Sequence, residues 1–140
     1  MTTNEPVRKE IFIEAPVEHV FTYLTQTERM LEWMGRGAEL DARPGGIFRV
    51  DINGDMVARG EYVEVVPHSR VVFTWGWEGD EEGFGPGMTR VEVTLQEENG
   101  GTRLQLEHHD LPDYTREQHG YNWEYFLGRV RIVAEGGRLG

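Results

Sequence analysis

The segment 115–135, close to the C-terminal end, has the pattern of one long amphipathic helix. Its large apolar side chains recur at helical spacing and fall on one stripe: Trp123, Phe126, Leu127, Val130, Val133 and Ala134. Thr115 and Gln118 predict a capping box at the start of the helix, and Gly136-Gly137 predicts its end. A helix with two large aromatic side chains on its buried stripe needs a concave apolar surface to receive it, and this requirement constrains the rest of the fold.

The chain before this helix consists mostly of predicted strands joined by short turns. Alternating or β-prone sequence predicts strands over 8–14, 38–43, 47–52, 56–66, 71–77, 89–95 and 102–109. Two short helices are expected over 17–24 and 27–33, the first beginning after Pro16 and the second capped by Thr27. Short connections such as Asn53-Gly54 and Asn99-Gly100 make neighbouring strands antiparallel.

This order of elements predicts an α+β fold. A curved antiparallel sheet of six or seven strands has one apolar face, and the segment 115–135 is the long element available to cover it. We therefore expect two short helices after the first strand, and a terminal helix packed across the sheet with space between them. The sequence contains neither an internal repeat nor a linker, so residues 1–140 are expected to form a single domain.

Composition excludes several classes of function. The chain has no cysteine, which rules out disulfides, thiolate catalysis and cysteine-ligated zinc. Its formal net charge of −11 argues against sequence-independent nucleic-acid binding, because phosphates attract Lys and Arg. No apolar run approaches the roughly 18 residues that suggest membrane insertion. The polar start Met1–Arg8 does not resemble a secretory signal, so a cytoplasmic location is expected.

Several motifs resemble those of one superfamily. The stretch 15–21 (APVEHVF) resembles the opening motif of the START-like, or helix-grip, superfamily. The stretches 44–48 (PGGIF), 60–67 (GEYVEVVP) and 70–75 (RVVFTW) resemble the branch named after the C-terminal domain of the activator of the Hsp90 ATPase. The stretch 120–127 (GYNWEYFL) resembles the terminal helix of that branch. The resemblance covers nearly the whole chain.

The resemblance implies a helix-grip fold with a hydrophobic cavity between the terminal helix and the sheet. It implies less about activity, because the superfamily includes lipid carriers, plant hormone receptors, polyketide cyclases and oxygenase domains. The eukaryotic activator also has a separate N-terminal domain that contributes to Hsp90 contact. This chain has no counterpart of that domain, which counts against co-chaperone activity.

The expected ligand of such a cavity is a small hydrophobic molecule, either aromatic, polyketide-like or lipid-like. The candidate ligand-binding residues on the strands are Phe48, Val50, Arg59, Glu61, Phe73, Trp75, Val91, Leu106 and His108. The terminal helix would contribute Trp123, Phe126, Leu127 and Val130. For the apolar members, the competing interpretation is ordinary core packing.

Two of these groups leave alternatives open. His108 could orient a polar ligand atom, act as a base, or bond to a local partner. If Val57, Val63 and Val65 point inward, then Arg59 and Glu61 do too, as an ion pair able to hold a polar ligand atom. A bulge at Gly60 would reverse this orientation.

Neither a cofactor, a metal site nor a catalytic set of residues is predicted. The histidines near 108 and 119 match no zinc motif, because adjacent His108 and His109 point to opposite faces of a strand. The glycine-rich acidic segment 78–87 is expected to be a mobile loop near the cavity mouth, where it could gate entry.

Three function classes remain. The expected one is a binding module for a small hydrophobic ligand. The alternatives are a cyclase-like or hydrolytic enzyme and a chaperone-linked protein-interaction domain. Tyr121, Tyr125 and Ile132, on the back of the terminal helix, could mark a partner surface or a homodimer contact. An open cavity favours the first two classes, whereas a filled interior with an outer patch favours the third.

Overall fold

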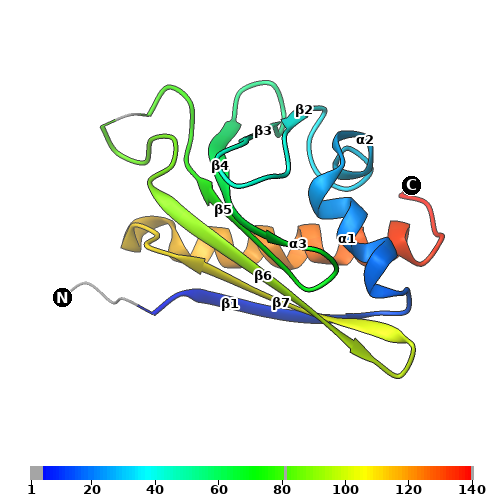
Figure 1. Ribbon diagram of the computed structural model, residues 1–140. Helices are drawn as coiled ribbons and strands as arrows, with labels where there is room; N and C mark the ends of the chain where they lie inside the picture. Colours follow the sequence, from blue (N-terminus) through cyan, green and yellow to red (C-terminus); the bar gives the residue numbers. More distant parts are fainter. Residues whose placement is uncertain (1–4, 81, 140) are drawn as a thin grey trace.

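Figure 1 shows the computed structural model of the protein, which describes residues 5–80 and 82–139. The described strands are β1 (Val7–Ile13), β2 (Gly37–Leu40), β3 (Ile47–Asp51), β4 (Val57–Val66), β5 (Arg70–Trp75), β6 (Thr89–Glu98) and β7 (Gly101–His109). The described helices are α1 (Val17–Thr25), α2 (Thr27–Met30), the short 3-10 helix η1 (Asp113–Thr115) and α3 (Arg116–Ala134). The expected elements are thus present in the expected order. No helix in these residues is long and apolar enough to cross a lipid bilayer.

The strands form one antiparallel sheet in the order β1-β7-β6-β5-β4-β3-β2. Neighbours from β2 to β7 are consecutive in sequence, and most of their connections are short, as at Asn99-Gly100, where both residues adopt positive φ. β1 pairs instead with β7, and α1 and α2 carry the chain toward the opposite edge (Figure 1). The orange ribbon of α3 lies across one face of the curved sheet, which confirms the α+β helix-grip architecture.

The apolar core lies between α3 and the sheet. Side chains at alternate positions of β5, β6 and β7 are buried there: Val71, Phe73, Trp75, Thr89, Val91, Val93, Leu95, Leu104, Leu106 and His108. The sequence predicts this inward face correctly, because the period of two along a strand fixes the direction of each side chain. α3 contributes Trp123, Leu127 and Val130, also as predicted.

The two ends of α3 differ from each other in how well they were predicted. The capping box does not form, because the Thr115 hydroxyl donates to the Pro112 carbonyl 2.8 Å away and no side chain caps the helix. At the other end Gly136 has φ +88°. The Gly136 N–H donates to the Val133 carbonyl and the Gly137 N–H to the Ile132 carbonyl, a Schellman motif. The glycine stop is therefore confirmed.

The start of the second short helix also differs from the prediction. The predicted cap at Thr27 is wrong: the residue at the N-cap is Gln26, and it makes no side-chain capping bond. Met30 and Trp33 are both buried. The Trp33 indole N–H donates to the Tyr23 carbonyl at 2.9 Å, which joins the segment after α2 to α1.

The long strand β4 contains the main irregularity of the sheet. Gly60 is needed for a close approach, because a Cβ at this position would lie 2.0 Å from the Thr74 carbonyl oxygen. The register shift lies between Tyr62 and Glu64 rather than at Gly60. Ala58, Gly60 and Tyr62 consequently face the core side, and Val63 is exposed.

Candidate functional site

Aromatic rings occupy the space between α3 and the centre of the sheet. Phe48 of β3 stacks on Phe73 of β5, with ring centroids 4.0 Å apart and an interplanar angle of 13°. Tyr62 of β4 packs edge-on against Phe48, with centroids 5.7 Å apart. Trp75 of β5 lies 5.5 Å from Trp123 of α3. These offset and tilted contacts are the favourable geometries of aromatic pairs, so the cluster joins three strands to the helix.

The cavity between α3 and the sheet has a volume of about 10 Å³. This is room for about one water molecule, whereas sites for drug-sized ligands measure roughly 300–1,000 Å³. Its walls are apolar and include Phe48, Phe73 and Trp123. The interior expected to be an open cavity is therefore filled by the protein's own side chains.

His108 of β7 is fully buried, and both of its ring nitrogens have hydrogen-bond partners. Nδ1 lies 3.0 Å from the Trp123 Nε1 and Nε2 lies 2.8 Å from the Thr89 hydroxyl. An indole N–H can only donate, so Nδ1 accepts. The Thr89 hydroxyl donates its proton to the Trp75 carbonyl at 2.8 Å and therefore accepts from the Nε2–H of His108.

These bonds fix His108 as a neutral imidazole with its proton on Nε2. Burial, followed by the nearby His119 and His109, holds the pKa of His108 well below its usual range. Neither nitrogen is free to take a proton from a ligand. Of the alternatives for this residue, the geometry supports a histidine that bonds to local partners.

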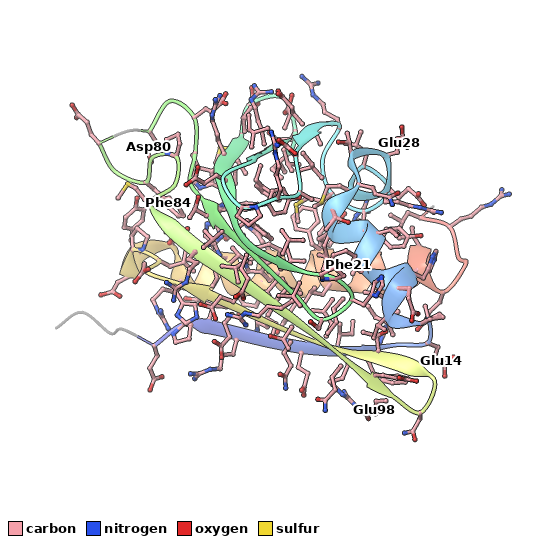
Figure 2. All side chains as sticks on the ribbon, viewed as in Figure 1. Glu14, Phe21, Glu28, Asp80, Phe84 and Glu98 are labelled. Carbon is pink, nitrogen blue, oxygen red and sulfur yellow. The ribbon has the colours of Figure 1, made fainter. Side chains whose placement is uncertain are left out.

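His119 of α3 and Phe84, from the segment between β5 and β6, close one end of the interior. The His119 ring lies 5.5 Å from the Phe84 ring and 6.0 Å from the Trp77 ring. Phe84 is buried, and Figure 2 shows it near the end of the molecule where α3 begins. Phe84 thus anchors residues 82–87 to the core, a contact that the expectation of a mobile loop over 78–87 leaves out.

One polar group of the aromatic cluster has no partner. The indole N–H of Trp75 is buried and donates to no other group in the described part of the chain. An unsatisfied buried donor costs roughly 1–3 kcal/mol. This N–H is therefore a buried donor that would gain from an added acceptor atom.

Most of the predicted ligand-binding residues are brought together in this core: Phe48, Val50, Phe73, Trp75, Val91, Leu106, His108, Trp123, Leu127 and Val130. Phe126 lies at the border, partly buried, with its ring 6.4 Å from that of Trp33. Ligand binding by these residues stays a prediction. Tyr62 was not among the residues predicted from the sequence, although its spacing from Gly60 places both on one face of β4.

The inward orientation considered for Arg59 and Glu61 is wrong, because both side chains are exposed on the outer face of β4. Arg59 pairs with Glu78 at 3.1 Å, and Glu78 also accepts from Arg49 at 2.7 Å. The reason is the position of the register shift: it follows Tyr62, so Gly60 keeps its inward position and its two neighbours face outward. The buried ion pair that would hold a polar ligand atom therefore does not form.

A cluster with metal-ligand chemistry lies elsewhere on the sheet. Glu92, Glu107 and His109 have ligand atoms within 4.8 Å of one another. Arg70 and Arg90 contact Glu92 at 3.1 and 2.8 Å, and Arg8 contacts Glu107 at 2.9 Å. These guanidinium groups already balance the carboxylates and would repel a cation, so the cluster is better explained as an ion-pair network.

We expect stability to fall as the pH is lowered from 7 to about 5, in part because of His119. Burial lowers the pKa of His119 from 6.5 to about 4, so in this window the unfolded chain binds a proton that the folded protein does not. The contribution of neutral His119 to the free energy of unfolding is complete above about pH 6.5 and is lost as the pH falls toward 4. The variant His119→Phe suits the aromatic surroundings. It should reduce the fall in unfolding free energy between pH 7 and about 5 by about 2 kcal/mol, as measured by urea unfolding at each pH.

The matched control is His68→Asn, which removes an exposed histidine at a position of positive φ that asparagine tolerates. It should leave the pH dependence of unfolding unchanged. An equal loss of stability in the parent protein and in His119→Phe would contradict the assignment of a neutral, buried His119.

Comparison with known proteins identifies relatives of this chain. The family model described as "Activator of Hsp90 ATPase homolog 1-like protein" matches residues 14–135. The human "Activator of 90 kDa heat shock protein ATPase homolog 1" is 28% identical over 133 residues. That match covers 94% of this chain but 37% of the human protein, so the chain spans little more than a third of its curated relative.

Solved structures share the fold over nearly the whole chain. The AHSA1-like protein from Rhizobium etli is 40% identical, with a TM-score of 0.78, and the match covers 100% of this chain and 88% of that one. DynU16, described as a putative protein in the dynemicin biosynthetic locus, is 26% identical, with a TM-score of 0.83 over 97% of this chain and 49% of that one. The family model covers most of the chain and its members share this fold, so the protein belongs to the family of Activator of Hsp90 ATPase homolog 1-like proteins.

Proposed function

We propose that this protein works by binding another protein, a chaperone ATPase of the Hsp90 class. The observation that carries the proposal is the filled interior, because a cavity of about 10 Å³ leaves recognition to the outer surface. Family membership and the 28% identical human activator supply the class of partner. Because the chain matches 37% of that relative, the proposal is limited to binding and does not extend to the relative's whole activity.

The charge of the protein indicates what surface such a partner presents. The net charge is −11, and arginines such as Arg49 and Arg59 are held in ion pairs with the chain's own carboxylates. Figure 2 shows labelled carboxylates on separate parts of the surface: Glu14, Glu28 and Asp80. The unbalanced surface charge is therefore negative, which favours a basic contact surface on the partner.

The enzymatic alternative finds no support in the interior. General acid–base catalysis needs a titratable group with a free site near the reacting atom. Both nitrogens of His108 are engaged, and burial keeps the pKa of His119 at about 4. Arg59 and Glu61, the charged pair considered from the sequence, lie outside the core.

The test is a calorimetric titration of a purified Hsp90-class chaperone from the same organism with this protein. We expect saturable one-to-one binding that weakens strongly between about 0.05 M and about 0.5 M salt, because complementary charges are screened over this range. A Trp75→Phe control should bind equally well, because Trp75 is buried. Absence of binding at low salt would overturn the proposal.

A second candidate function is binding of a small hydrophobic ligand that carries a hydrogen-bond acceptor. The unpartnered indole N–H of Trp75, surrounded by aromatic rings, favours it. Such a ligand would have to displace side chains, since the cavity holds about 10 Å³ in the closed structure.

Thermal unfolding in the presence of polyketides, flavonoids, fatty acids or sterols tests this second function. If it is right, one chemical class raises the melting temperature of the parent protein, and Trp75→Phe, which keeps an aromatic ring but removes the N–H, reduces the shift. Equal shifts in both proteins would show that the N–H does not hold the ligand. No shift from any class would leave protein binding as the supported function.

A further inference from the structure

The face of α3 turned away from the sheet carries a regular row of exposed residues. Tyr121, Tyr125 and Ile132 are 61%, 60% and 40% exposed, and Gly128 falls between the last two. The steps along this row are four, three and four residues. This is the spacing of a coiled-coil seam, in which apolar positions alternate by three and four. Tyr114, one heptad before Tyr121, is also exposed.

Gly128 is not explained by the fold of a single copy. A Cβ at this position would meet no atom within 4 Å, so the packing of α3 on the sheet does not require a glycine. A glycine within a helix lowers its stability relative to alanine. At the centre of an exposed row, however, it allows the backbone of a second helix to approach closely.

A column of charged residues runs beside the row. Glu117, Glu124 and Arg131 of α3 follow one another at intervals of seven residues, and all three are exposed. With Tyr125 at position a of the heptad, this column occupies the g positions, which set the partner and orientation of coiled coils. The column is acidic before Gly128 and basic after it.

This change of sign makes the face complementary to itself in one orientation. When two such helices lie antiparallel, their g columns face each other, so Glu124 of one copy lies opposite Arg131 of the other. Glu124 contacts Lys9 through Oε1, which leaves Oε2 for a second partner. Arg131 has no ion-pair partner within the described residues. Antiparallel helix dipoles also attract each other.

We propose that two copies of this protein pair through the outer face of α3, as antiparallel helices that cross near Gly128. The contact is isologous, since each copy presents the same row and the same column. It buries few side chains per copy, so the dimer is weak and sensitive to salt. The proposal does not depend on a chaperone partner, because the second copy supplies every complementary group.

Sedimentation equilibrium of the purified protein over a range of concentrations tests the pairing. We expect a reversible monomer–dimer equilibrium. Glu124→Arg and Arg131→Glu should each weaken the dimer about tenfold or more, because each places like charges opposite one another at two symmetric contacts. Mixing these two variants should restore association, since one copy then carries two arginines and the other two glutamates. Glu97→Arg, an equal charge change at an exposed residue of β6, is the control and should not weaken the dimer.

A further variant separates loss of pairing from loss of folding. Gly128→Gln should raise the melting temperature of the monomer, because there is space for the side chain and glutamine favours the helix. The same variant should abolish association by blocking the close approach. A parent protein that stays monomeric at every concentration would overturn the proposal. Failure of the two charge variants to associate with each other when mixed would do the same.

Discussion

The hydrogen bonds around His108 tie the long helix to the sheet. Trp123 of α3 donates to the ring, the ring donates to Thr89 of β6, and Thr89 donates to the main chain of Trp75 on β5. Each of these polar groups is buried and depends on the next, because a buried donor or acceptor without a partner is costly. These hydrogen bonds therefore fix the distance between the helix and the sheet, and the aromatic rings fill the remaining space between them.

The filled interior limits what this fold can enclose in this protein. A curved sheet with a helix across it can enclose a ligand only if the side chains between them are small or displaced. In this protein stacked rings such as Phe48 and Phe73 occupy that space, and Phe84 closes one end. Under the proposed function, recognition falls to the acidic surface and to the outer face of α3.

Periodicity predicted the sheet, its inward face and the terminal helix, because these depend on patterns of two and 3.6 residues that are local in sequence. It did not predict the filled interior, which depends on how distant rings pack against one another. Thr89 and Trp123 are far from His108 in the chain, so no local pattern identifies them as its partners. The inward orientation considered for Arg59 was wrong for a related reason: no glycine in the sequence marks the register shift after Tyr62.

The most direct test of the closed interior is a nitrogen–proton NMR correlation spectrum of the imidazole rings, recorded from about pH 8 down to about pH 5, across the range in which an ordinary histidine titrates. We predict that His108 is neutral, carries its proton on Nε2 and keeps the same chemical shifts throughout. Protonation on Nδ1, or titration of His108 within this range, would show that a ring nitrogen is free. That result would contradict a sealed core and return attention to the space beneath α3.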